Sequence, residues 1–196
     1  GRVKVETKTN EIKAIPALLE LLDISGCIIT IDAMGTQTQI AQRIVDKGAD
    51  YVLCLKANHL TLWKEVKTWF EDAQHQNFEG IEHQYDAQVE SGHHRREIRK
   101  VWAVPLHQMG SLHQISQWAG LKTIVMVSRV RWLWNRITRE VMFYIMSGKL
   151  HLIKPCGKHW YSRICIMVVQ LDLILPEVAD LQCGFYRSRY SRSLGD

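Results

Sequence analysis

Asp32 is the residue whose type and position most directly suggest chemistry. It follows residues 27–31, a short apolar run of the kind that forms a strand buried on both faces. In open α/β sheets, ligands bind at the carboxyl ends of the strands. A carboxylate at such an end can hold a divalent cation or act as a base, and it can equally cap the helix that follows. The position alone leaves the catalytic and the capping interpretations open.

A second group with chemical potential is the charged stretch 92–100, Gly-His-His-Arg-Arg-Glu-Ile-Arg-Lys. Its cations Arg95, Arg96, Arg99 and Lys100 are candidates for contacts to nucleic-acid phosphates. Glu97 lies among them and can pair with Arg95 or Arg99 across a strand. The solvated charged face of a strand would have the same composition, so this second interpretation also stays open.

The composition of the chain is that of an ordinary soluble globular domain, with 196 residues, of which 46% are hydrophobic and 23% charged. The formal net charge of +5 favours an anionic partner, and nucleic acid is the commonest one. The turn after Asp32 has neither the G-x-G-x-x-G nor the P-loop pattern, which argues against a nucleotide-binding loop there. No signal peptide opens the chain, and the apolar stretch 164–175 is too short to span a bilayer. We therefore expect a cytoplasmic protein with no membrane partner.

The elements that must position Asp32 alternate between the strand and helix periods over residues 1–55. Strands are expected at 2–6, 27–32 and 50–55, and helices at 12–22 and 40–45. This order predicts a parallel α/β sheet with right-handed crossovers.

The pattern changes after a further amphipathic helix expected at 60–70. Residues 74–88 are polar and loop-like, whereas 98–104, 122–131 and 139–146 indicate strands of an antiparallel section. From Gly148 onward neither period is maintained. The sequence therefore predicts one domain over residues 1–147 and a divergent tail, disordered in part, over 148–196.

Six stretches in this order resemble one known family. They are Thr9-Asn-Glu-Ile, Ala14-Ile-Pro-Ala-Leu-Leu-Glu-Leu-Leu-Asp-Ile, Gly26-Cys-Ile-Ile-Thr-Ile-Asp-Ala-Met-Gly-Thr-Gln, Gly48-Ala-Asp-Tyr-Val-Leu-Cys-Leu-Lys-Ala-Asn, Gly92-His-His-Arg-Arg-Glu-Ile-Arg and Phe143-Tyr-Ile-Met-Ser. Together they resemble the central part of bacterial insertion-sequence DDE transposases of the H-repeat-associated type. The resemblance covers residues 1 to about 147.

The resemblance implies an α/β fold, a partial ribonuclease-H-like core with an antiparallel β insertion. It also implies DNA cleavage and strand transfer at transposon ends, with DNA as the partner and Mg²⁺ as the cofactor. In such a core three carboxylates hold two magnesium ions, which activate the attacking oxygen and stabilise the leaving one. Asp32 matches the second of these acids and is therefore the expected catalytic residue and metal ligand.

The sequence departs from the family at the other two acids. The Asp-Gly-Lys-Thr-Leu stretch that carries the first acid does not occur, which suggests truncation at the N-terminus. His159-Trp160 resembles the start of the third motif, but Arg163 stands at the position of its Glu. A frameshift or decay of the reading frame near residue 148 would explain this tail. Glu97 is the candidate for a substitute catalytic acid.

Two functional hypotheses follow from these departures. The first is an inactive transposase fragment, because one carboxylate cannot supply the oxygen ligands that two magnesium ions need. The alternative is a non-catalytic DNA-binding remnant that uses Arg95, Arg96, Arg99, Arg129, Arg131 and the arginines of the tail. An unrelated α/β ligand-binding domain ranks last, since fold alone does not give function. The sequence does not indicate whether the chain forms an oligomer.

Overall fold

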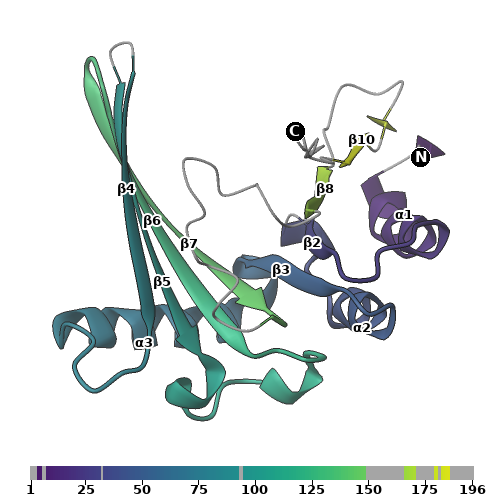
Figure 1. Ribbon diagram of the computed structural model, residues 1–196, viewed down its shortest axis with the longest axis horizontal. Coiled ribbons are helices and arrows are strands. Elements are labelled where there is room, and N and C mark those ends of the chain that lie inside the picture. The colour runs from purple at the N-terminus through teal and green to yellow at the C-terminus, as the bar shows by residue number, and fades with distance from the viewer. Residues whose placement is uncertain are drawn as a thin grey trace, which may run out of the picture.

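The computed structural model describes residues 4–5, 8–31, 33–92, 95–148, 166–170, 179–180 and 182–185. Most of its strands form one sheet, flanked by helices (Figure 1). The order across this sheet is β10-β8-β2-β3-β7-β6-β5-β4. The strands are β2 (Ile28–Ile31), β3 (Asp50–Leu55), β4 (Gln84–Gly92), β5 (Arg95–Pro105), β6 (Thr123–Leu133), β7 (Arg136–Met146), β8 (Ile166–Gln170) and β10 (Gln182–Phe185).

The α/β part of the fold agrees with the alternation of periods in the sequence. Helices α1 (Lys8–Leu21) and α2 (Thr38–Asp46) alternate with strands β2 and β3, which pair in parallel. Ile15, Leu18 and Leu19 form the buried face of α1, at the i, i+3, i+4 spacing that places side chains on one side of a helix. The predicted α/β fold class is confirmed in this part.

The first strand does not join the parallel sheet as predicted. β1 (Lys4–Val5) pairs antiparallel with β9 (Ala179–Asp180), and these two strands form a separate sheet. The alternation of apolar and charged residues identified the strand correctly. The predicted pairing of this strand was wrong, because alternation at every second residue shows which face of a strand is buried but not which strand pairs with it.

A four-stranded antiparallel meander, β4 to β7, continues the sheet on the other side of β3. Strand β7 pairs antiparallel with β3, so the meander extends directly from the α/β part. Helix α3 (Leu60–His75) lies along one face of the meander at its lower end (Figure 1). Phe143 of β7 contacts Trp63 and Phe70 of this helix, with ring centroids 6.3 and 5.7 Å away.

The stretch 74–88 was expected to be a loop, but β4 begins within it, at Gln84. β4 is the edge strand of the sheet, and its residues 88–92 are half-buried or exposed. An edge strand that is solvated on both faces does not need apolar residues at alternate positions. This is the physical reason why its period was missed.

Short strands also occur in the stretch 148–196 that was expected to be a divergent tail. β8 pairs in parallel with β2, and β10 pairs antiparallel with β8. The other residues after Gly148 lie outside the described part of the chain, as do the side chains of these strands, so the boundary at residue 148 stays a prediction. Within the described residues, no helix combines the length and the apolar character needed to cross a membrane.

Candidate functional site

The carboxyl ends of β2 and β3 lie side by side, as the sequence predicted for the place where Asp32 occurs. The two strands are in parallel register, with Ile31 opposite Leu53. Asp32 itself lies outside the described residues, and a short 3₁₀ turn, η1 (Ala33–Gly35), begins at the next position. The site must therefore be built from the described residues on either side of it.

Three polar side chains hold the turn after β2 against the end of β3. The buried Thr36 hydroxyl donates to the carbonyl oxygen of Cys54 at 2.9 Å. Asn58 Nδ2 donates to the carbonyl oxygen of Ala33 at 2.7 Å. His59 Nε2 lies 2.7 Å from the carbonyl oxygen of Thr36. Since a carbonyl only accepts, His59 carries a proton on Nε2.

Gly35 allows the same turn to approach the strand and helix beside it. A Cβ at this position would lie 2.2 Å from Ile31 Cγ2 and 2.8 Å from Ile15 Cδ1. Both distances are well inside van der Waals contact, so only glycine fits without displacement of the buried isoleucines. The turn is thus held from two sides: by close packing against β2 and α1, and by hydrogen bonds from the segment that follows β3.

Two surface hollows lie near the carboxyl end of β3. One, of about 290 Å³, is lined by residues that include Lys56, Trp63 and Glu140. The other, of about 210 Å³, is lined by residues that include His59, His113 and Trp118. The lining of the first hollow contains one carboxylate, that of Glu140, and the lining of the second contains none.

A magnesium site cannot be assembled from the described residues alone. No group of three or more His, Cys, Asp or Glu side chains lies close enough together within the described part of the chain to hold a metal ion. A two-metal centre needs several carboxylate oxygens. Asp32 lies outside the described residues, so its role as a metal ligand stays a prediction.

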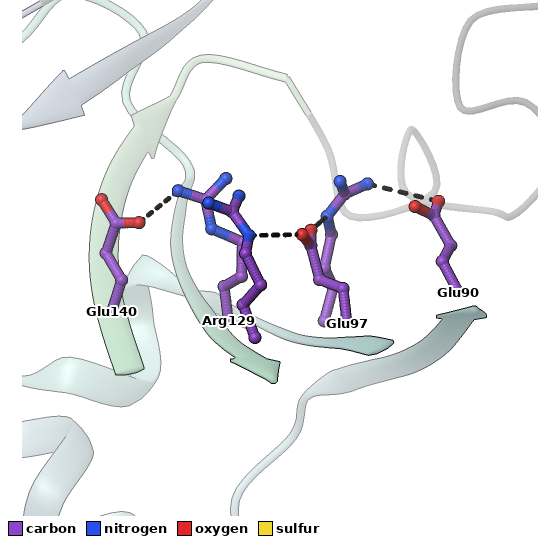
Figure 2. A network of polar contacts seen from close by, with 6 residues as sticks. Glu90, Glu97, Arg129 and Glu140 are labelled. Atoms are coloured by element: carbon purple, nitrogen blue, oxygen red, sulfur yellow. Dashed lines mark hydrogen bonds and ion pairs between the residues drawn. The ribbon is translucent and has the colours of Figure 1, made fainter. Parts of the chain in front are cut away.

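The charged stretch 95–100 lies on β5, in the middle of the meander, and Glu97 forms the centre of an ion-pair network (Figure 2). Arg99 Nε donates to Glu97 Oε1 at 2.5 Å, and Arg131 Nε donates to Oε2 at 2.7 Å. Arg99 also pairs with Glu90 at 3.5 Å. The Glu97 side chain is fully buried, whereas the two arginines are about a third exposed (40% and 30%).

The protonation equilibrium of Glu97 reflects these neighbours. Burial acts to raise the pKa of the Glu97 carboxyl, but the hydrogen bonds and positive charges of Arg131 and Arg99 outweigh it and lower the pKa below its ordinary value. Glu97 is therefore an ionised carboxylate, with each of its oxygens accepting a hydrogen bond from an arginine.

The place of Glu97 in the sheet bears on its predicted role as a substitute acid. Strands β3, β7 and β6 lie between β2, which precedes Asp32, and β5, which contains Glu97. With about 4.8 Å between neighbouring strands, β2 and β5 are about 19 Å apart. Carboxylates that share a metal ion lie within a few ångströms of it. The catalytic role of Glu97 stays a prediction that this placement does not favour.

The structure does not bring the four predicted DNA-binding cations to one surface. Successive side chains of a strand point to opposite faces. Arg99 lies on the face of Glu97, whereas Arg96 and Lys100 lie on the other face. There the Arg96 guanidinium is 5.9 Å from the centre of the Trp132 ring. The side chain of Arg95 lies outside the described residues.

Comparison with known protein families identifies the family to which this chain belongs. The transposase DDE domain family matches residues 2–134. The chain belongs to this family. The family implies a ribonuclease-H-like fold, which agrees with the α/β part described above. The predicted membership of a DDE transposase family is thereby confirmed.

Relatives of the chain include two longer bacterial proteins. An "Uncharacterized protein in dhlA 3'region" of Xanthobacter autotrophicus is 40% identical over 144 residues, which are 74% of this chain and 47% of that protein. The "H repeat-associated putative transposase YhhI" of Escherichia coli is 35% identical over 186 residues, 90% of this chain and 47% of that protein. The chain thus spans about half the length of these relatives. No solved structure shows a significant match.

Sequence reasoning did not single out the residues that hold the turn after β2. Thr36, Asn58 and His59 act through backbone carbonyls of residues far away in the sequence, at separations of 18 to 25 residues. Thr36 and Asn58 belong to the stretches that resemble the family, and this was the signal that could have identified them. Their roles depend on tertiary contacts that no local period encodes.

Proposed function

We propose that the chain is a segment of the catalytic domain of a DNA transposase that works with Mg²⁺ in the cytoplasm, and that Asp32 is one of its metal-binding carboxylates. The observation that carries this proposal is the family match over residues 2–134, which includes Asp32 and the turn after it. The parallel β2–β3 pair and the closely held turn support it, because together they make a rigid support at the carboxyl end of a strand.

Magnesium in such an enzyme would activate the attacking oxygen and stabilise the leaving oxygen at a DNA phosphate. The chain itself would contribute the carboxylate of Asp32 and cations that contact DNA. By its resemblance to the family, the chain has Arg163 in place of the third acid, and the described residues contain no group of three or more metal-binding side chains. We therefore propose that the 196-residue chain alone does not cut DNA.

A plasmid-nicking assay tests this proposal. The full chain is incubated with supercoiled plasmid and Mg²⁺, beside an Asp32→Asn variant and a buffer blank. Equal background nicking in all three is expected. Binding of Mn²⁺, followed by its paramagnetic effect on water relaxation, should be weak and should decrease in the Asp32→Asn variant. Nicking that requires Asp32 would refute the inactivity, and metal binding that does not depend on Asp32 would refute its role.

A second candidate function is a non-catalytic DNA-binding protein. It is favoured by the formal net charge of +5 and by the cations of the meander. Binding to DNA that weakens steeply with salt, without Mg²⁺ and without cleavage, is the expected result. Affinity that does not change with salt would exclude phosphate contacts and with them this candidate.

A further inference from the structure

The upper part of the meander has one face that no element of the described chain covers. We call it the distal face. It consists of three rows of cross-strand neighbours from β4 to β7. These rows are Ser91–Arg96–Trp132–Ile137, Val89–Ile98–Val130–Arg139 and Ala87–Lys100–Ser128–Val141.

Helix α3 covers only the adjoining lower rows of this face. The next row down contains Trp102 and Phe143, which pack against residues of α3 and of the turn after it. Above that row the strands extend beyond the helix, as Figure 1 shows. Val89, Ile137 and Val141 of the distal face are 51–57% exposed, which is unusual for large apolar side chains grouped on one surface.

The two faces of the upper meander differ in charge. Each row of the distal face contains one cation, Arg96, Arg139 or Lys100, and none of its twelve residues is acidic. All three of these cations are exposed.

The opposite face holds the carboxylates of this region. Glu90 and Glu97 pair there with Arg99, Glu97 also pairs with Arg131, and Glu140 pairs with Arg129 (Figure 2). Three arginines of that face are therefore paired with carboxylates, whereas no carboxylate occurs among the residues of the distal face.

We propose that the distal face binds single-stranded DNA, an inference that rests on the proposed function. Its three cations would contact phosphates, and its apolar and aromatic side chains would pack against unstacked bases. Trp132 is half-buried and lies beside Arg96, so its indole is held by a neighbour while part of it is exposed. An aromatic ring with a cation beside it on an open sheet is suited to stacking on a base.

The apolar content of the face is the reason for choosing a single strand over a duplex. In a duplex the base faces are stacked inside, so Val89, Ile98 and Ile137 would meet a charged backbone. In a single strand the base faces are accessible and bury apolar surface. Arg96 and Lys100 lie four residues apart on β5, about 13 Å by strand rise, so they would contact phosphates some distance apart on one strand.

Fluorescence anisotropy with a labelled oligothymidine of about 15 nucleotides tests the proposal on the full chain. Arg139→Ala should weaken binding and reduce the slope of log affinity against log salt by about 0.7. Arg136→Ala is the matched control, because Arg136 is exposed on the same strand but lies on the opposite face. This control should leave the affinity unchanged.

Two further variants examine the remaining parts of the face. The triple variant Arg96→Ala, Lys100→Ala, Arg139→Ala should lose most of the binding and reduce the salt slope by about 2. Trp132→Leu should weaken binding on the order of tenfold while keeping the salt slope, since it removes stacking and no charge. Urea unfolding of each variant verifies that it still folds.

Several results would overturn the proposal: equal losses in Arg139→Ala and Arg136→Ala, tighter binding of a duplex of the same length, or unchanged binding by Trp132→Leu. Self-association that depends on the same residues, without DNA binding, would assign the face to a second copy of the chain instead. No metal or cleavage enters these measurements. A failed Asp32→Asn experiment therefore leaves them valid, and their failure leaves the role of Asp32 untouched.

Discussion

At the residue scale, the neighbours of Glu97 and of Gly35 determine which side chain each position can hold. Glu97 is a buried carboxylate whose negative charge is compensated by Arg99 and Arg131. A buried charge is tolerated when it is paired and hydrogen-bonded, and removal of one partner leaves an uncompensated charge. Gly35 satisfies a steric requirement instead, because two isoleucines occupy the space that any side chain would need.

Glu97→Gln should lower the free energy of unfolding by about 3 kcal/mol at neutral pH, because it leaves two partly buried guanidinium groups without their carboxylate. Glu90→Gln is the control. It removes an exposed partner of Arg99 and should cost under about 1 kcal/mol. Urea unfolding measures both variants. Equal losses of unfolding free energy in the two variants would show that the burial of Glu97 does not add to the cost of removing its charge.

The pH dependence of the same network has a definite sign. The pKa of Glu97 is lowered in the folded protein, so its stabilising contribution is present above the ordinary pKa of glutamate. The contribution is lost as the pH falls through the lowered value. The wild type should therefore lose more stability than Glu97→Gln when the pH is lowered through this acid range. Parallel curves for the two proteins would contradict the assignment.

Gly35→Ala should destabilise the chain by about 1–3 kcal/mol, because the new methyl group overlaps the buried Ile31 and Ile15 side chains. Gly92→Ala is the matched control, since nothing lies within 4 Å of a Cβ at that position. Thermal and urea unfolding of the two variants provide the comparison. A Gly35→Ala variant as stable as Gly92→Ala would mean that the turn moves away from β2 at little cost.

At the element scale, the end of α1 illustrates how one side chain completes a helix from a distance. The last carbonyls of a helix have no partner within it. Lys47, just after α2, donates to the carbonyl oxygens of Leu19, Glu20 and Leu22 at 2.7 to 3.3 Å. A cation at this end also interacts favourably with the helix dipole. The contact links α1 to α2 beside the β2–β3 pair.

Lys47→Met should lower the free energy of unfolding by about 1–2 kcal/mol, because it keeps the length of the side chain but removes the donors to these carbonyls. Lys67→Met on α3 is the control, since Lys67 makes an exposed i,i+4 pair with Glu71, worth about 0.5 kcal/mol, and a cation–π contact 5.6 Å from the centre of the Trp63 ring, but caps no helix. Urea unfolding distinguishes the two. A loss for Lys47→Met no larger than that for Lys67→Met would exclude a capping role.

The elements that the sequence predicted best are those with a buried apolar face. The period of α1, the apolar run before Asp32 and the strands of the meander all reflect burial, and burial is what a period records. The edge strand β4, the partner of β1 and the contacts of Thr36 and Asn58 were not predicted. Each depends on which segments meet in space, and a local pattern carries no such information.

The features of the candidate site also fall into some that the sequence predicted and others that it did not. The position of Asp32 after a buried strand followed from the sequence, and β2 and η1 on either side of it agree with that reading. The basic stretch on β5 was also found, but not its division between two faces. Alternation along a strand implies that division once the strand is known. The sequence had named Arg99 as a possible partner of Glu97, and the structure contains that pair. The pairing of Arg131 with Glu97 required the register of β5 and β6.

At the scale of the whole molecule, two parts meet along β3 and β7, and Ser147 lies at their junction. Its hydroxyl donates to Asp50 Oδ1 at 2.8 Å and accepts a hydrogen bond from the backbone N–H of Tyr51 at 2.9 Å. Tyr51 is fully buried, and its hydroxyl donates to the carbonyl oxygen of Ala119. This junction connects the lower meander to the α/β part, while the described residues provide no such junction for the upper meander.

Hydrogen exchange should therefore show a gradient along the meander. Local opening costs least where apolar contacts are few, and amides there exchange fastest. Amides of 123–126 and 143–146, next to α3 and β3, should exchange about as slowly as those of Leu53 and Leu55. Amides of 129–133 and 136–140, in the upper meander, should exchange much faster although they are paired in the same strands. Uniform protection along β6 and β7 would mean that the distal face is covered in solution, and the argument for an open surface there would fail.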